Sequence, residues 1–164
     1  MTLERKNLVY RAMKPCEENE VCSLVTRVFK RFVAPQYSQG GIDEFLRYAA
    51  APKAMVTRIQ ANHFVLVAEL NGSIVAMIEV RDSNHISLFF VEGRLQQQGI
   101  AKELLRRALE ICTRNQAGMA KLTVNSSPNA VGAYQTMGFK FEGPEQTKNG
   151  IRFVPMALSS DLSL

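Results

Sequence analysis

The segment Gln96-Gln97-Gln98-Gly99-Ile100-Ala101 has the composition of a loop that binds an anion. It follows a β-rich run and precedes an apolar helical pattern, so its last residues supply the first amides of a helix. Those amides lack intrahelical partners and lie at the positive end of the helix dipole, which suits phosphate groups. Small residues at Gly99 and Ala101 allow a ligand close to the main chain. A simple turn before a helix is the alternative that the local sequence leaves open.

The same segment matches neither of the two common nucleotide-binding motifs. A P-loop requires Gly-Lys-Ser or Gly-Lys-Thr, and the dinucleotide fingerprint requires three spaced glycines. Residues 96–101 contain one glycine and no lysine. Both of these nucleotide folds are therefore disfavoured.

Glu79 is a candidate general base. Strand alternation places it on one face with Val75 and Met77. Apolar surroundings disfavour the charge of a carboxylate and make it a better proton acceptor, directly or through water. A solvated or ion-paired carboxylate is the alternative. Histidine has an intrinsic pKa suited to a base, but His63 and His85 occupy strand starts, where surface roles are expected.

The elements that must position these residues follow from a change of hydrophobic period. Two helical patterns cover residues 17–28 and 42–49, and then two strand-like runs flank Asn71-Gly72, a strong hairpin signal. A third run at 85–91 precedes the wide apolar helix that begins after Gly99 and runs to about 112, and a strand at 122–125 follows it. This crossover favours a parallel pair.

The complete order of elements, β-α-α-β-β-β-α-β-α-β-β, predicts an α/β (α+β) fold. We expect a mixed, mainly antiparallel sheet of about six to seven strands, flanked by about four helices. No linker or repeat divides the sequence, so residues 1–164 are predicted to form one domain.

Two motifs in this framework resemble those of the GNAT superfamily of N-acetyltransferases. The first is Leu88-Phe89-Phe90-Val91 followed by Gln96-x-x-Gly99-x-Ala101. The second runs from Val124-Asn125-Ser126 through Asn129-Ala130-x-x-x-Tyr134 to Gly138-Phe139. Gln96 stands where arginine is commoner, Gly93 where proline is frequent and Ala101 where a glycine is usual. The order of elements also matches, so the resemblance spans nearly the whole chain.

The resemblance implies acetyl-CoA as cosubstrate, with no metal. It places pantetheine on the backbone of a splayed strand end, and a backbone amide near Phe90 or Val91 would stabilise the oxyanion. The implied cofactor-binding residues are Phe89, Phe90, Val91, Gln96, Gln97, Gln98, Gly99, Ile100, Ala101, Asn125 and Asn129. For Asn129, a helix N-cap after Pro128 is the alternative. Tyr134 matches the position whose hydroxyl protonates the leaving sulfur, and packing of its ring in the core is the alternative.

The function predicted from this resemblance is transfer of an acetyl group to a primary amine by direct attack on the thioester. A catalytically silent acyl-CoA-binding sensor or scaffold is the alternative. The net charge of +5 raises an RNA-binding function as a third hypothesis. Because the basic residues are scattered rather than clustered, nucleic acid is not an expected partner.

The acceptor is predicted to be a small-molecule or protein amine. We expect its pocket to be lined by the first two helices and by the segments around Phe32–Tyr37 and Thr147–Phe153. That lining would combine aromatic with basic residues, which suits an acceptor that carries a carboxylate: Phe32, Tyr37, Phe153, Arg31, Lys148 and Arg152. No apolar run approaches the ~20 residues of a membrane span, and residues 1–7 lack the apolar core of a secretory signal. We therefore expect a cytoplasmic protein with no membrane partner. An exposed final strand would make homodimer formation a further option.

Overall fold

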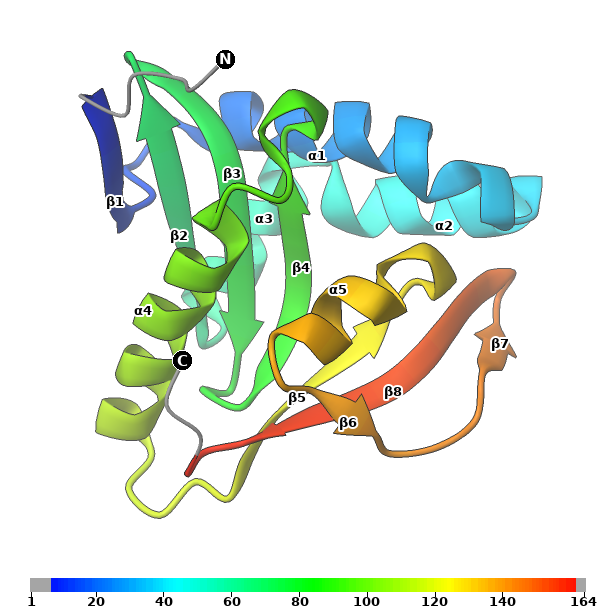
Figure 1. The fold of residues 1–164 in the computed structure, drawn as a ribbon. Helices are drawn as coiled ribbons and strands as arrows, with labels where there is room; N and C mark the ends of the chain where they lie inside the picture. The colour runs from blue at the N-terminus through cyan, green and yellow to red at the C-terminus, as the bar shows by residue number, and fades with distance from the viewer. Residues whose placement is uncertain (1–6, 162–164) are drawn as a thin grey trace.

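The computed structural model describes residues 7–161. Residues 1–6 and 162–164 of the predicted 1–164 domain lie outside this range, and so does most of the segment 1–7 that lacks the apolar core of a signal. Within this range the chain forms eight strands and five α-helices around one sheet (Figure 1). The strands are β1 (Leu8–Ala12), β2 (His63–Leu70), β3 (Ser73–Arg81), β4 (His85–Val91), β5 (Lys121–Ser126), β6 (Lys140–Phe141), β7 (Gln146–Lys148) and β8 (Ile151–Ser159). The helices are α1 (Glu18–Phe32), α2 (Gln39–Ala49), α3 (Pro52–Gln60), α4 (Ile100–Asn115) and α5 (Val131–Thr136).

The strand order is β1-β2-β3-β4-β5-β8-β6, and β7 pairs with β8. Strands β4 and β5 are parallel, and every other pair in the described sheet is antiparallel. The predicted mixed, mainly antiparallel fold is confirmed, including the crossover through α4. The final strand is not an exposed edge, because β8 pairs with β5 as well as with β6 and β7, so that reason for expecting a homodimer is wrong.

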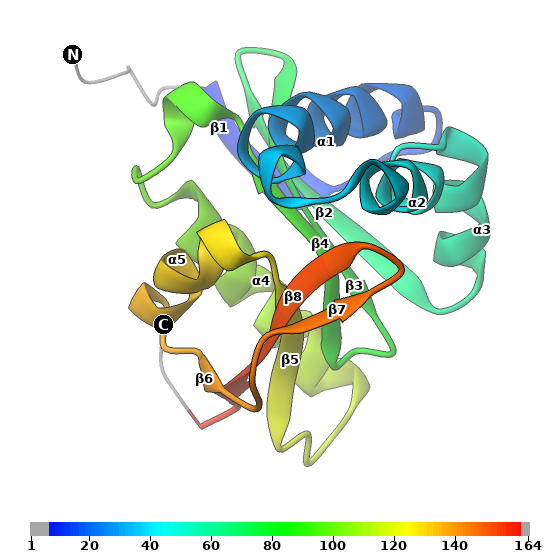
Figure 2. The same cartoon turned by 90° about the vertical axis from the view of Figure 1, so that its right-hand side faces the viewer.

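The helices divide between the two faces of the sheet, as Figure 2 shows edge-on. Helices α1, α2 and α3 cover one face, while α4 and α5 lie on the other. The buried stripe of α1, which includes Leu24 and Val25, packs in one hydrophobic cluster. Leu104 and Leu105 of α4 pack in the other. The sheet is therefore buried on both faces in the region where β3 and β4 run.

Two elements go beyond the predicted set. Helix α3 begins at Pro52, and its buried positions are Met55 and Arg58, so a charged residue interrupts the apolar face that would have signalled a helix. The three residues of β7 are all exposed and show no apolar alternation. Both elements therefore depend on tertiary contacts that a local pattern cannot show.

Two irregularities in strand register change which way residues face. Ala68 pairs with Ala76 and Glu69 with Ile74, which leaves Val75 as an extra residue in β3. Val75 consequently packs in the α4 cluster, whereas Met77 packs in the α1 cluster, so the predicted shared face of Val75 with Met77 and Glu79 is wrong. In β4, Ser87 is extra in the same sense, because Ile86 pairs with Val80 and Leu88 with Glu79.

A membrane-spanning helix would need more length and a more apolar sequence than any helix in residues 7–161 possesses.

Candidate active site

Strands β4 and β5 form a fork. They pair only at His85–Thr123 and Ile86–Val124. Beyond these positions β4 continues along β3 as far as Val91, while β5 continues along β8. The edge of β4 that faces β5 therefore has no strand partner over its last five residues, which include Phe89, Phe90 and Val91.

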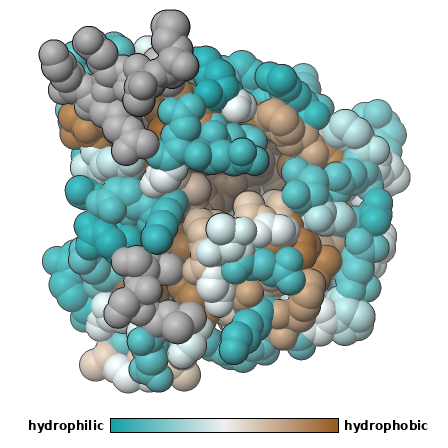
Figure 3. Space-filling view, viewed as in Figure 1, coloured by the Kyte–Doolittle hydropathy of each residue, from teal (hydrophilic) through white to brown (hydrophobic). Residues whose placement is uncertain are grey.

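A chamber of about 830 Å³ opens at this fork. Figure 3 shows it as a hollow with an apolar floor on the face of the molecule that carries α4 and α5. Its floor is the β4 segment from Ile86 to Val91 together with Leu95 and Val124. Three groups of residues surround this floor, and one of them, on the side of α1 and α2, also includes Phe90 of the floor.

The first group, here called the loop side, is the start of α4 with the residues before it: Gln96, Gln97, Gly99, Ile100, Ala101 and Lys102. Gly99 is the N-cap residue, with φ +86°, a conformation that glycine adopts without strain. The first hydrogen bond of the helix runs from Glu103 N to Gly99 O, so the amides of residues 100–102 have no partner in the helix. They lie at the positive end of a sixteen-residue helix, as the anion-site prediction requires.

Not every residue of the predicted loop faces the chamber. The Gln98 side chain donates a hydrogen bond to Arg94 O, 3.2 Å away, and Gln98 does not line the chamber. Gln96 lines it and donates to Val91 O at 3.1 Å, which joins the loop to the end of β4. A Cβ added at Gly99 would meet no atom within 4 Å, so the turn requires this glycine for its φ angle while the space in front of it stays open.

Lys102 is a residue of the loop side that sequence reasoning missed. It is the only charged side chain among the described residues that line the chamber. A cation in the first turn of a helix is normally unfavourable, because it faces the positive end of the dipole. That placement, immediately after a glycine turn, is the signal that would have identified it as a partner for an anion.

The second group is the α5 side, which consists of residues from the end of β5 to the end of α5: Asn125, Ser127, Asn129, Ala130, Gly132, Ala133, Tyr134, Thr136 and Met137. Asn125 and Asn129 both line the chamber. The N-cap alternative for Asn129 is wrong, because the N-cap position of α5 is Ala130 and no side chain caps the helix.

Tyr134 is buried in α5 between two aromatic neighbours. Its ring meets Phe89 and Phe139 edge-on, with centroids 6.2 and 5.1 Å away. It also lines the chamber, so Tyr134 both packs in the core and reaches the chamber. Burial raises the pKa of Tyr134 well above that of a free tyrosine, which keeps the hydroxyl protonated and available as a proton donor.

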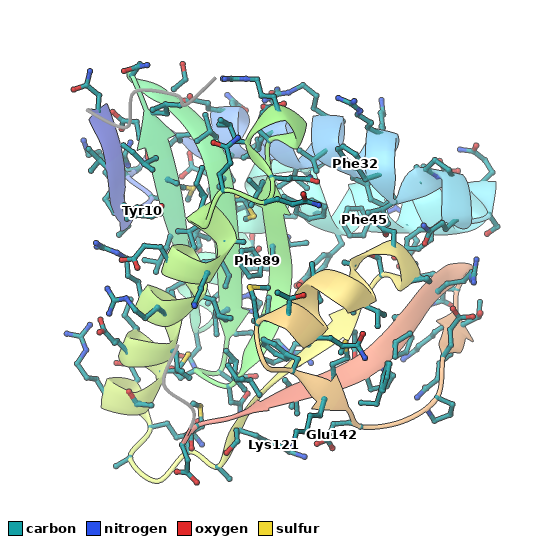
Figure 4. The ribbon with its side chains drawn as sticks, in the orientation of Figure 1. Tyr10, Phe32, Phe45, Phe89, Lys121 and Glu142 are labelled. Atoms are coloured by element: carbon teal, nitrogen blue, oxygen red, sulfur yellow. The ribbon has the colours of Figure 1, made fainter. Side chains whose placement is uncertain are left out.

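The third group is the aromatic side, formed by Val28, Phe32, Val33, Tyr37, Phe45 and Phe90. Phe45 stacks on Phe29 with ring centroids 4.0 Å apart and meets Phe90 edge-on at 6.0 Å. Figure 4 shows Phe32 and Phe45 on α1 and α2, and Phe89 lies apart from them on β4, where it packs against the α4 cluster. Burial raises the pKa of Tyr37 to about 12, so its hydroxyl also stays neutral.

The predicted basic residues do not line this side. Arg31 lies over the Phe32 ring, 5.0 Å from its centroid. Arg152 forms an ion pair with Glu145 at 3.0 Å and donates to Gln36 O at 3.4 Å. Since neither these arginines nor Lys148 line the chamber, the expectation of a carboxylate-bearing acceptor has no support in this geometry.

Two contacts join distant segments of the chain, and one of them involves Asn129 of the chamber lining. Asn129 N donates a hydrogen bond to Gln36 Oε1 at 3.2 Å, which links the segment after α1 to the segment before α5. Gly41 of α2 abuts the β7–β8 turn so closely that an added Cβ would lie 2.2 Å from Gly150 O. This contact requires a glycine at position 41, and it holds α2 against the hairpin.

Glu79 is not brought to the chamber. It is fully buried on the face covered by α1–α3, where Arg58 of α3 forms hydrogen bonds of 2.7 and 3.0 Å to its two carboxylate oxygens. His63 Nδ1 lies 3.1 Å from the same carboxylate. Glu79 is therefore an ion-paired carboxylate, as the alternative prediction had it, and its ion pair with Arg58 anchors α3 to the sheet.

His85 also lies outside the chamber lining. Its Nδ1 lies 2.7 Å from Thr123 Oγ1 at the closed end of the fork. Burial lowers the pKa of His85 to about 4, so its ring is neutral near neutral pH. Within the described lining there is thus no Asp, Glu or His side chain.

Ser87 is the second residue that sequence reasoning missed. It lines the chamber directly after the last β4–β5 pair. Its Oγ is the only buried side-chain polar atom in residues 7–161 without a hydrogen-bond partner. No sequence signal marks it, because its position results from the extra residue in β4.

Comparisons with known proteins agree with this geometry. A sequence profile for the acetyltransferase (GNAT) domain matches residues 33–160. The chain belongs to the GNAT family of acetyltransferases. It is accordingly an enzyme that uses acetyl-CoA, as the motifs implied.

Solved GNAT structures share the fold at low sequence identity. A GCN5-related N-acetyltransferase from Rhodopseudomonas palustris is 18% identical, with a TM-score of 0.80 over 94% of this chain and 96% of that one. PaiA N-acetyltransferase from Thermoplasma acidophilum, solved with coenzyme A, is 18% identical, with a TM-score of 0.76 over 93% and 99%. The ribosomal-protein-S18-alanine N-acetyltransferase from Escherichia coli is 15% identical, with a TM-score of 0.63 over 95% and 96%. No curated protein sequence matches the chain.

Proposed function

We propose that this GNAT protein transfers an acetyl group from acetyl-CoA to a primary amine by direct attack in the chamber. The observation that carries the proposal is the fork, which combines an unpaired β4 edge with the free amides of α4. Acetyl-CoA supplies the thioester carbonyl and a thiolate leaving group. The loop side would hold the pyrophosphate through the amides of residues 100–102 and the Lys102 ammonium.

The free edge of β4 supports the next two roles. Main-chain groups of Phe89 and Val91 would bind the pantetheine arm, since the strand that would otherwise pair with them has diverged. An amide near Phe90 or Val91 would donate to the carbonyl oxygen as it gains negative charge. Asn125 and Asn129 would contact the arm from the α5 side.

The chemical step requires a neutral amine and a proton for the departing sulfur. The amine nitrogen forms the new C–N bond, the C–S bond breaks, and the Tyr134 hydroxyl donates its proton to the sulfur. No carboxylate or imidazole lines the chamber within the described residues, so none is assigned as base. Apolar surroundings disfavour the ammonium form and thereby favour the neutral nucleophile. The proton that the amine loses leaves to solvent, and solvent returns a proton to the Tyr134 phenolate, which restores the enzyme.

The test of this proposal is Tyr134→Phe. We expect kcat to fall by ~10²-fold, a typical contribution of a general acid, with the Kd for acetyl-CoA nearly unchanged. Tyr48→Phe is the matched control, because Tyr48 is 40% exposed and does not line the chamber. Equal kcat for the two variants would remove Tyr134 from the acid role. Binding of acetyl-CoA by the parent protein with no transfer to any amine would instead indicate the silent acyl-CoA-binding module.

A further inference from the structure

The aromatic side of the chamber carries information about the acceptor. We propose that the acceptor is a small primary amine whose nitrogen is joined by a short chain to an aromatic or similarly bulky apolar group. This inference rests on the proposed acetyl transfer and specifies its substrate class.

The first support is the composition of the aromatic side. Four of its six residues have aromatic rings, and the other two are valines. Contacts with Phe29 and Phe90 fix the orientation of Phe45, so this surface is formed before any acceptor binds. A preformed apolar surface favours a ligand that presents apolar area, and aromatic rings add edge-to-face contacts.

The second support is charge. A polyamine carries a second cationic group that requires a carboxylate, and no acidic side chain lines the chamber in residues 7–161. Glu92, which follows Val91 in the chain, is held by Arg27 at 2.6 Å and does not line the chamber. An acceptor with a carboxylate fares no better, because Arg31 and Arg152 lie outside the lining. An acceptor with one amine and an apolar body avoids both penalties.

The third support is size. The Gln36–Asn129 hydrogen bond joins the segment after α1, next to Tyr37 of the aromatic side, to Asn129 of the α5 side. A lysine on a folded protein would have to bring its surrounding surface to this entrance. A small molecule needs only to enter the chamber, so this link between its two sides favours a free amine over a protein surface.

The experiment compares purified protein with acetyl-CoA and three amines: 2-phenylethylamine, spermidine and a lysine-containing peptide. Release of free thiol gives kcat/KM for each. We expect kcat/KM for 2-phenylethylamine to exceed the other two values by at least ~10²-fold, because burial of an aromatic ring is worth this much in binding. A preference for spermidine or for the peptide would overturn the acceptor class while leaving acetyl transfer intact. Acetyl-CoA binding without transfer to any amine would contradict the proposed function itself.

Two variants test whether the aromatic side determines the preference for an aromatic amine. Phe45→Leu should raise KM for 2-phenylethylamine by ~10-fold and leave the Kd for acetyl-CoA unchanged, since it removes ring contacts from the aromatic side alone. Phe141→Leu is the control, because Phe141 is 58% exposed and does not line the chamber. Acetyl-CoA-induced thermal stabilisation shows that each variant is folded. Unchanged KM in a folded Phe45→Leu protein would overturn the assignment of the aromatic side.

A second, independent observation concerns Ser87. Its buried hydroxyl has no partner in the described structure, although native proteins rarely leave such a group unsatisfied. It lines the chamber where β4 and β5 diverge. We infer that Ser87 Oγ forms a hydrogen bond to a reactant bound at the fork, which makes Ser87 a binding residue of the transfer reaction.

Ser87→Ala separates this role from a structural one. We expect the melting temperature of the free protein to stay the same or rise, because an unsatisfied hydroxyl is removed, and kcat/KM to fall by ~10-fold. A rise in the Kd for acetyl-CoA would identify the cosubstrate as the partner, and a rise only in the KM for the amine would identify the acceptor. Ser73→Ala, at an exposed strand start, is the control. Lower stability with unchanged kinetics would overturn the inference.

Discussion

The loop side and the aromatic side of the chamber are built from different parts of the polypeptide. The loop side uses main-chain amides at the start of α4, supported by a glycine turn and one lysine. The aromatic side uses side chains from α1, α2, β4 and the segment between the two helices. A site made of backbone requires particular residues at fixed spacing, whereas a site made of side chains requires only that suitable groups converge. The first kind is visible in a sequence, and the second emerges from the fold.

The largest effect expected from this comparison is that of Gly99→Val. A β-branched residue at φ +86° is strongly disfavoured, so the turn should distort and the free amides should lose their alignment. We expect the Kd for acetyl-CoA to rise by ~10²-fold and stability to fall by about 1–3 kcal/mol.

Gly72→Val is a closely matched control for the effect on binding. Gly72 has φ +83°, and an added Cβ there also meets no atom within 4 Å, but it lies in the β2–β3 turn. Both variants should lose similar stability, and only the change at position 99 should weaken acetyl-CoA binding. A similar loss of affinity in both would show that general strain, rather than the loop side, determines binding.

A smaller effect is expected for Lys102→Ala. Loss of one charge from the phosphate site should raise the Kd for acetyl-CoA by ~10-fold, and the difference from the parent protein should shrink at high salt. The free protein should become slightly more stable, because a cation leaves the positive end of α4. Lys140→Ala, on an exposed strand residue, is the control for calorimetric measurement of both quantities.

The smallest effect is expected in the pH dependence, which shows whether the titrating group belongs to the acceptor or to the enzyme. Between about pH 6 and 10, log(kcat/KM) should rise with pH and level off near the pKa of the acceptor amine. His85 contributes no titration in this window, since its pKa lies near 4 and the ring is already neutral. Tyr134 contributes no basic decline, since burial raises its pKa and the proton-donating form persists.

Two arylalkylamines of different basicity make this test decisive. The midpoint of the profile should move with the pKa of the acceptor. A midpoint that stays fixed when the acceptor changes would show that a group of the enzyme acts as base.

The parts of the fold that the sequence predicted depend on local signals, and the parts that it missed depend on distant contacts. The Asn71-Gly72 hairpin is confirmed with both residues at positive φ, and so is the crossover from β4 through α4 to β5. Helix α3 was missed because Arg58 occupies its buried face, where a distant partner, Glu79, satisfies the charge. No window of sequence around α3 contains that partner.

The residues of the candidate site can also be separated into those that local motifs identified and those that only the fold revealed. The loop residues and Tyr134 were found through spaced motifs, and all but Gln98 line the chamber. Ser87 and the misassigned face of Val75 depend on extra residues in β4 and β3, which shift register without leaving a compositional mark. Val28, Val33 and Phe45 belong to patterns that also describe ordinary helix packing, so their convergence on the chamber required the fold.

The most direct test of the central claim is product analysis by mass spectrometry. The protein is incubated with acetyl-CoA and 2-phenylethylamine, and the acetylated amine is quantified alongside free thiol. We predict one molecule of N-acetylated product for each thiol released, and strong suppression of both in Tyr134→Phe. Thiol release without acetylated amine, or equal product from the parent and Tyr134→Phe proteins, would contradict direct transfer in this chamber.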